Sequence, residues 1–264
     1  MGFFGVRGTV VTMDEGLGVV RDGVVVVDPS RGVVVDVGPP SLIGDYGLDP
    51  VYGGPGRVVM PGLINTHTHS PMSILRGFVS GVSGLKWLRA VWEVESLLKP
   101  RHVYVGAVLS IASMIRSGTT AFADHYFYAE EVGRAVVESG VRGVLAKAVV
   151  ELPGGPPKHD LRDSVAFATT WAGRGGGRVS TMIGIHSLYT CRAETVSEAV
   201  EESLSRGVPI HMHLSESRDE LEVVRGRYGT TPIKLADRLG VLRVRHLLAP
   251  VSYTHLTLPT TERV

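Results

Sequence analysis

The feature that most constrains this chain is a regular alternation of apolar strand segments with helical segments between residues 62 and 249. The strand-like runs are "GLINTH" (62–67), "TTAFAD" (119–124), "RGVLAKAVV" (142–150), "VSTMIGIH" (179–186), "VPIHMHL" (208–214) and "VRHLLA" (244–249). The segments between several of them have helical spacing, as in "RAETVSEAVEESLSRG", which Gly207 closes. Such alternation requires a parallel sheet, either doubly wound or closed into a barrel.

The first sixty residues have a different pattern. The valine runs "GTVVTM", "GVVVVD", "GVVVDVG" and "GRVVMPG" are separated by Asp-Gly, Pro-Ser, Arg-Gly and Gly-Pro-Gly turns, and no helical period is present. We therefore expect residues 1–60 to form a small β region of their own. Residues 61–249 are expected to form the α/β domain.

Two observations favour the barrel over the doubly wound sheet. No Gly-x-Gly-x-x-Gly follows the first strand, which argues against a dinucleotide-binding crevice. Polar residues instead gather where successive strands end: His67, His69, Asp124, His125, His186 and His213. The carboxyl ends of the strands are the rim on which a (β/α)8 TIM barrel builds its active site. We therefore predict the barrel.

Composition narrows the class of protein. The chain has 264 residues, of which 44% are hydrophobic, and its 27 basic residues nearly balance 26 acidic ones. This composition suits a globular protein and predicts neither nucleic-acid binding nor attachment to a membrane surface. The single cysteine, Cys191, and the absence of a signal-like start predict a cytoplasmic protein. The sequence leaves open whether the chain forms a homo-oligomer.

The histidines at the strand ends predict chemistry as well as fold. His67 and His69 are two residues apart on a strand and point to the same side. His213 ends the fifth strand, and Glu216 lies three residues further on. Three imidazole ligands, an open position and a nearby carboxylate are typical of a hydrolytic metal site. Each histidine taken alone is compatible with a packing role, and on spacing alone His211 is as good a candidate ligand as His213.

Several motifs together carry a resemblance to a known family. The segments "VMPGLINTHTHSPMSILRG", "IRSGTTAFADHYF", "IHSLYTC" and "IHMHLSES" resemble the amidohydrolase superfamily. Within it, the chain is most similar to the methylthioadenosine/S-adenosylhomocysteine deaminase and chlorohydrolase-like branch. The resemblance implies a (β/α)8 barrel of the metallo-dependent hydrolase type. It also implies that residues 1–60 are the N-terminal half of a small β-sandwich.

The same resemblance assigns roles to residues by motif. It implies one divalent metal ion, with zinc favoured and iron as the alternative, and it favours His213 over His211. It implies that Glu216 moves the proton, that His186 and Trp87 contact the substrate, and that Glu95 binds ribose hydroxyls. The segment between Trp87 and Glu95 is one residue shorter than the family pattern. The assigned residues are, for the metal, His67, His69 and His213; for catalysis, Glu216; and for the substrate, Trp87, Glu95 and His186.

The implied reaction is hydrolytic deamination of a small molecule, an adenine nucleoside thioether such as S-adenosylhomocysteine or 5'-methylthioadenosine. Two alternatives stay open: a related hydrolase acting on guanine, cytosine or a triazine, and a non-catalytic fragment. Lys147 raises the question of a carboxylated lysine that bridges two metals. That lysine belongs on the fourth strand, whereas Lys147 is on the third, so a single metal is favoured.

The C-terminal segment departs from the family pattern. Residues 63–249 correspond to about six of the eight barrel units. The following "PVSYTHLTLPTTERV" (250–264) contains "VSYTHL", which resembles a translated sequencing adapter. We therefore expect residues 250–264 to be a non-native tail on a truncated barrel. We also expect this 264-residue chain to be inactive.

Overall fold

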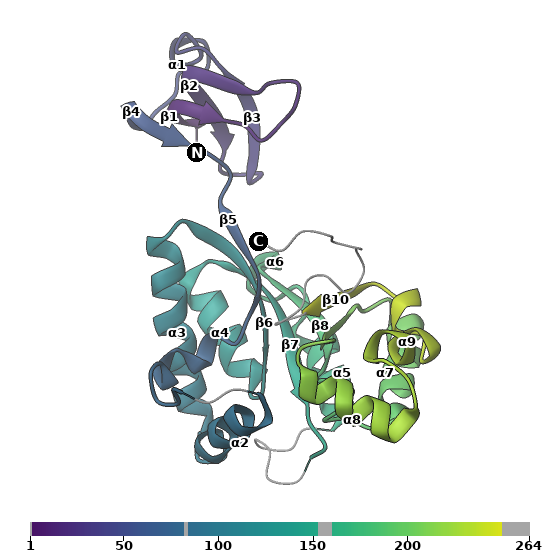
Figure 1. The fold of residues 1–264 in the computed structure, drawn as a ribbon. Helices are drawn as coiled ribbons and strands as arrows, with labels where there is room; N and C mark the ends of the chain where they lie inside the picture. Colours follow the sequence, from purple (N-terminus) through teal and green to yellow (C-terminus); the bar gives the residue numbers. More distant parts are fainter. Residues whose placement is uncertain (1, 82–83, 153–159, 250–264) are drawn as a thin grey trace. The chain divides into compact units, whose positions relative to one another are not determined.

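The computed structural model describes residues 2–81, 84–152 and 160–249. Contacts between Cα atoms divide the chain into two compact units, one ending at Leu63 and one beginning at Ile64 (Figure 1). The expected non-native tail, 250–264, lies outside the described residues.

The N-terminal unit contains a four-stranded sheet in the order β3-β2-β1-β4, drawn in purple and blue in Figure 1. Strand β2 pairs antiparallel with both β1 and β3, and β4 runs parallel to β1. The elements are β1 (Phe4–Val11), β2 (Val19–Asp28), β3 (Val33–Gly38), the short helix α1 (Leu42–Asp45) and β4 (Val51–Val59). The β structure expected for this region is confirmed.

Alternation of side chains along β2 explains how this sheet acquires a core. Val24 and Val26 are fully buried and pack with Leu48, whereas Val25 and Val27 on the other side are only partly buried. Successive residues of a strand point to opposite faces, so a run of valines can supply one buried face.

The second unit contains a six-stranded sheet whose strands follow chain order, β10-β9-β8-β7-β6-β5. The neighbouring pairs β6/β7, β7/β8, β8/β9 and β9/β10 are parallel, as the strand–helix alternation predicts. The strands are β5 (Leu63–Thr68), β6 (Thr119–Tyr126), β7 (Arg142–Val149), β8 (Val179–Ile185), β9 (Ile210–His213) and β10 (His246–Ala249).

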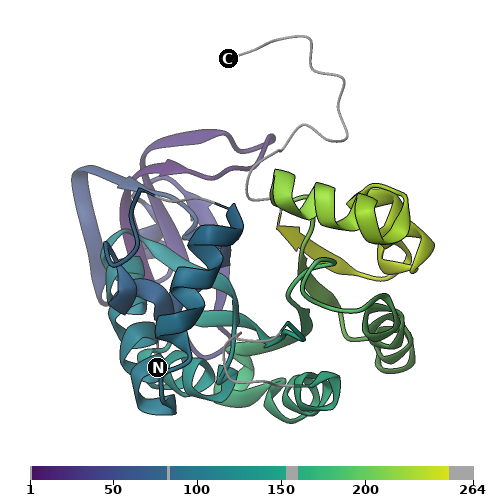
Figure 2. The same ribbon diagram turned by 60° about the horizontal axis from the view of Figure 1, so that its bottom comes forward.

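Helices pack against this sheet in the order of the chain, and Figure 2 shows them following one another around its outside. Helix α3 contacts β6, α4 contacts β7, α5 contacts β7 and β8, and α7 contacts β8 and β9. The helices are α2 (Gly84–Glu95), α3 (Pro100–Arg116), α4 (Ala129–Ser139), α5 (Leu161–Trp171), α6 (Arg174–Gly177), α7 (Ala193–Arg206), α8 (Arg218–Tyr228) and α9 (Pro232–Arg238), with short 3-10 helices η1 (Ser70–Leu75) and η2 (Val241–Arg243).

Strand β9 shows how the sheet separates its two faces. Ile210 and Met212 are fully buried in the apolar cluster that includes residues of α7, α8 and α9. His211 and His213 alternate with these two residues and point to the opposite face of the sheet, where both contact His67 of β5. The apolar residues hold the helices in place, so the histidines are left on the face that points away from them.

Among the described residues, no helix is both long enough and apolar enough to cross a lipid bilayer.

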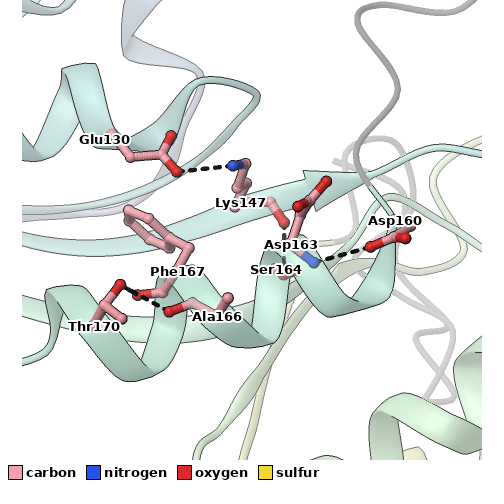
Figure 3. Close-up of polar contacts among 8 residues, drawn as sticks. All are labelled: Glu130, Lys147, Asp160, Asp163, Ser164, Ala166, Phe167 and Thr170. Carbon is pink, nitrogen blue, oxygen red and sulfur yellow. Dashed lines mark hydrogen bonds and ion pairs between the residues drawn. The ribbon is translucent and has the colours of Figure 1, made fainter.

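We predict that Ser164 is a stabilising link between two strands. Its hydroxyl donates to the Lys147 carbonyl oxygen at 2.8 Å, a contact shown in Figure 3, and accepts from the Gly184 backbone N–H at 2.9 Å. S164A leaves both buried groups without this partner, so the free energy of unfolding should fall by about 1–3 kcal/mol. Urea denaturation measures the change.

Thr170 on the same helix provides the control for this measurement. Its exposed hydroxyl donates to the carbonyl of Ala166, within α5 (Figure 3). T170A should therefore change stability by less than about 0.5 kcal/mol. Equal effects of S164A and T170A would contradict the proposed link.

Candidate active site

Three histidines meet at the carboxyl ends of β5 and β9. His67 lies on β5, His69 directly follows that strand, and His213 is the last residue of β9. His213 Nε2 lies 3.1 Å from His67 Nε2 and 3.2 Å from His69 Nε2. Three ring nitrogens of residues far apart in the sequence thus face one point, and the trio has the spacing of a group that could hold a metal ion.

Backbone carbonyls fix which nitrogen of two of these rings carries the proton. His69 Nδ1 donates to the His125 carbonyl at 2.5 Å, and His213 Nδ1 donates to the His186 carbonyl at 2.9 Å. A carbonyl oxygen can only accept, so each Nδ1 bears the proton and each Nε2 presents a lone pair. Hydrogen bonding of the second ring nitrogen is the usual way in which a metal-binding histidine is oriented.

Burial keeps the three imidazoles neutral at physiological pH. Loss of hydration lowers the pKa of His67 to about 4 and lowers the pKa of His69 and His213 as well. Nearby imidazoles add to the effect for His67 and His213. Two unprotonated Nε2 atoms at 3.2 Å suit a shared cation, because their lone pairs otherwise face each other. Neutral imidazole donors fit Zn²⁺ and Fe²⁺, and three of them leave a coordination position open.

Glu216 lies in the loop that follows His213, and its backbone is held on both sides. Ser215 before it adopts a left-handed conformation (φ 58°), and the Glu216 N–H donates to Glu220 Oε2 at 2.7 Å. The Tyr189 hydroxyl donates to Glu216 Oε2 at 3.2 Å. Burial raises the pKa of Glu216 above its ordinary value. The carboxyl group is therefore fixed in place and more basic than a solvated glutamate.

One pocket brings together every predicted site residue except His67. It is lined by His69, His213, Glu216, Trp87, Glu95 and His186, with Trp92, Tyr126, Phe127 and several aliphatic residues. His67 joins the group through its contact with His213. The cavity is small, about 60 Å³, and Trp87, Trp92, Tyr126 and Phe127 give it an aromatic wall.

Glu95 is the last residue of α2 and is buried beside Tyr126. The Tyr126 hydroxyl donates to Glu95 Oε1 at 2.5 Å, and burial raises the pKa of Glu95 to about 7. Glu95 lines the pocket although the segment before it is one residue shorter than the family pattern. Trp87, at the other end of this segment, lines the pocket too.

His186, just after β8, faces the histidine cluster. Its ring centroid lies 5.0 Å from that of His213, and its Nδ1 contacts the Thr190 hydroxyl at 2.9 Å. Burial lowers its pKa to about 3, so the ring is neutral. Within the described residues, the hydrogen bonds of this ring are made by Nδ1, so Nε2 can meet a ligand of the pocket.

Sequence reasoning did not single out Trp92, Tyr126 and Tyr189. The Trp92 ring lies 6.0 Å from that of His186, edge to face. Leu88 and Trp92 are four residues apart on α2, so helical spacing from Leu88 could have indicated it. Tyr189 sits inside the quoted motif "IHSLYTC" and contacts Glu216, but nothing in its spacing marks that contact.

Helix α2 is tied to the helix that follows Glu216. Asp219 Oδ2 on α8 accepts the backbone N–H of Leu85 at 2.8 Å, at the start of α2. Gly84 has φ +61°, and a Cβ at this position would collide with the Asp219 carboxylate. The left-handed conformation therefore favours glycine here, and a larger residue would also displace the Asp219 carboxylate.

Lys147 does not join the histidine cluster. It lies on β7, the third strand of the sheet, and its Nζ is 2.8 Å from Glu130 Oε1 at the start of α4 (Figure 3). This placement on the third strand agrees with the sequence analysis. The ion pair occupies the amine, and the arrangement gives no support to a lysine that bridges two metals.

The remaining histidines differ in their surroundings. His102 accepts a hydrogen bond from the Lys99 N–H, and His246 is an exposed residue of β10. His159 and His255 lie outside the described residues. His125 and His211 are fully buried beside the cluster.

Comparison with known proteins gives one consistent picture. A sequence profile described as "Amidohydrolase family" matches residues 58–264. A relative from Pelotomaculum thermopropionicum, named 5-methylthioadenosine/S-adenosylhomocysteine deaminase, is 38% identical over 244 residues, covering 91% of this chain and 55% of that protein. A 5'-deoxyadenosine deaminase from Methanosarcina acetivorans is 36% identical over 233 residues, covering 88% of this chain and 53% of that protein.

A solved structure supports the same fold. The zinc-bound adenosine deaminase from Xanthomonas campestris matches with a TM-score of 0.79 and 26% identity, covering 94% of this chain and 57% of that one. This match confirms the predicted barrel-type α/β fold. The chain spans about half the length of the curated relatives that it matches.

We predict that Glu220 makes stability depend on pH. It is fully buried, and burial raises its pKa from 4.5 to about 8. Between these two pH values the folded chain keeps a proton that the unfolded chain releases. Stability should therefore fall as pH rises and level off above pH 8. E220Q removes this ionisation while its amide oxygen can still accept the Glu216 N–H.

Melting curves at pH 5 and pH 8.5 test the prediction. The loss of stability between the two should be smaller in E220Q than in the wild type, by an amount on the order of a few kcal/mol. Glu222 on the same helix is exposed and pairs with Arg218, so E222Q is the matched control and should follow the wild type. An unchanged pH dependence in E220Q would contradict the prediction.

Proposed function

The chain belongs to the amidohydrolase family, and we propose from this that the protein is a metal-dependent hydrolase that deaminates an adenine nucleoside thioether. S-adenosylhomocysteine and 5'-methylthioadenosine are the named candidates. One observation carries the proposal: three neutral imidazole nitrogens meet in a pocket that also holds a buried glutamate. The names of the relatives support the substrate class, since they share an adenosine altered at its 5' position.

In this proposal His67, His69 and His213 hold one divalent cation. Such a cation would supply a nucleophile at neutral pH, because it would lower the pKa of a bound water to about 7. We propose zinc, because the similar adenosine deaminase structure contains it; iron is the alternative that imidazole ligands also suit.

Glu216 is proposed to move the proton. Its carboxylate lines the same pocket as His69 and His213, and burial raises its pKa toward the range in which a general base and acid can exchange protons. It would take one proton from the attacking water and deliver it to a ring nitrogen of the purine. It would then pass the proton that remains on the added oxygen to the amino group, so that the C–N bond breaks, the carbonyl forms and ammonia leaves. The hydrogen bond from Tyr189 keeps the carboxyl group from rotating away.

The substrate is proposed to lie against the aromatic wall. Trp87 would pack on the base or on the thioether, and His186 would contact the substrate with its free ring nitrogen. Tyr126 leaves Glu95 Oε2 free, so this oxygen can accept a hydrogen bond from a ribose hydroxyl.

A reducing, cytoplasmic location belongs to the proposal. The thiol of Cys191 is buried and its pKa is raised to about 11, mainly by desolvation, so it is neither a nucleophile nor positioned for a disulfide.

Release of ammonia from a panel of substrates tests the function in the whole protein. We expect the highest kcat/KM for 5'-methylthioadenosine, S-adenosylhomocysteine or 5'-deoxyadenosine, and much lower values for guanine, cytosine and a chlorotriazine. E216Q should keep its metal, measured by elemental analysis, and lose about 10²–10⁴-fold in kcat because it cannot exchange a proton. Full turnover in E216Q would show that Glu216 has another role.

The role of Glu95 has its own test. The wild type should prefer a nucleoside to its 2',3'-dideoxy analogue, and E95Q should reduce this preference by about tenfold, mainly through KM. Glu93, an exposed residue of the same helix, is the control, and E93Q should keep the preference. A preference that survives in E95Q would mean that the ribose lies elsewhere.

A further inference from the structure

His211 is the histidine of the motif "IHMH" that the proposed function leaves without a role. It lies in the middle of β9, two residues before His213, and its side chain is fully buried. Because residues two apart on a strand share a face, His211 points to the same side as His213. It therefore lies on the same face of the sheet as the three histidines His67, His69 and His213, and not on the face that the helices cover.

The ring of His211 contacts one member of that group directly. His211 Nε2 lies 2.8 Å from His67 Nδ1, and the two rings are nearly perpendicular, at 77°. Two nitrogens at this distance share one proton, and which ring supplies it depends on the tautomers.

The three metal-binding histidines differ in what supports them. His69 and His213 each donate their Nδ1 proton to a backbone carbonyl. His67 has the imidazole of His211 in the position where the other two have a carbonyl. A histidine that gives its Nε2 lone pair to a cation must carry its proton on Nδ1, and that proton needs an acceptor. For His67 the acceptor in place is His211 Nε2.

We propose that His211 is a positioning residue that holds His67 in the orientation and tautomer needed for metal binding. The inference rests on the proposed function, because it concerns the same metal site. It assigns His211 no contact with substrate or metal.

A histidine suits this position because it can either accept or donate. In the arrangement in which His67 carries its proton on Nε2, it donates to the unprotonated His213 Nε2, 3.1 Å away. His67 Nδ1 then accepts from His211 Nε2–H. With a cation at the site the direction reverses, and His211 becomes the acceptor. A backbone carbonyl can only accept, so it could not support both arrangements.

Two other roles for His211 fit the observations less well. As a fourth ligand it would need a nitrogen that converges with those of the other three, but its Nε2 is at hydrogen-bond distance from His67, and His211 is not among the three residues whose ligand atoms converge. As a packing residue it would not need its nitrogen at hydrogen-bond distance from His67.

Nuclear magnetic resonance of the protein labelled with ¹⁵N-histidine tests the tautomers without any assay of activity. Long-range ¹H–¹⁵N spectra report which ring nitrogen carries the proton. On addition of one equivalent of Zn²⁺ we expect the His67 proton on Nδ1 and the His211 proton to move from Nε2 to Nδ1. His69 and His213 should keep Nδ1–H throughout. A His211 tautomer that does not respond to Zn²⁺ would overturn the inference.

Zn²⁺ affinity, measured by competition with a chromophoric chelator, tests the consequence. H211M keeps a side chain of similar size without a strong acceptor and should weaken Zn²⁺ binding by about 10- to 100-fold. H211Q, whose amide can accept or donate, should recover most of this loss. H246M replaces the exposed histidine of the neighbouring strand and should bind Zn²⁺ as the wild type does.

The outcomes separate the two proposals. If the wild type binds no Zn²⁺, the proposed function fails. If the wild type binds Zn²⁺ and H211M binds it equally well, the proposed function stands and the role of His211 is wrong. Circular dichroism shows whether H211M is folded; if it is not, the tautomers of the wild type decide the question.

Discussion

The hydrogen bonds from His69 and His213 to two backbone carbonyls are the interactions on which the site depends. The two carbonyls belong to His125 and His186, at the ends of β6 and β8. The backbone of the sheet therefore determines which nitrogen of each ring has no proton. No side chain has to be recruited for this purpose, and the carbonyls cannot rotate away. The regular backbone of a parallel sheet thereby orients two imidazoles of the histidine cluster.

Burial at this site shifts the pKa values of its histidines and its glutamates in opposite directions. Burial lowers the pKa of His67 and His186 and raises the pKa of Glu95 and Glu216. Both shifts favour the uncharged form of the side chain. A pocket of this kind holds few charges until a cation enters, and a cation would draw the nearby carboxyl groups back toward ionisation.

The sequence predicted the fold well because its signals are periodic. The shared face of His211 and His213 and the order of strands and helices follow from spacing alone, and each was found as expected. Spacing also suggested that His67 and His69 point the same way. It could not choose between His211 and His213, because both lie on one face, and only the partners of their nitrogens separate them.

Contacts between distant elements were beyond the reach of the sequence. The pairing of Tyr189 with Glu216 and that of Lys147 with Glu130 depend on how loops and helices close over the strands. Neither has a periodic signature. Spacing along a strand placed His67, His69 and His213, whereas Trp87 and Glu95 came from the family resemblance and contacts such as that of Tyr189 depend on tertiary packing.

The hydrogen bond from the Leu85 N–H to Asp219 links two parts of the pocket that the chain separates by more than a hundred residues. One end of α2 carries Trp87, and α8 begins two residues after Glu216. A substitution that remodels the aromatic wall to admit a bulkier ligand would therefore also disturb the loop that aims the glutamate. Divergence toward new ligands would therefore alter both helices together. The left-handed backbone at Gly84 disfavours other residues there, so the start of α2 is a poor place for such a change to begin.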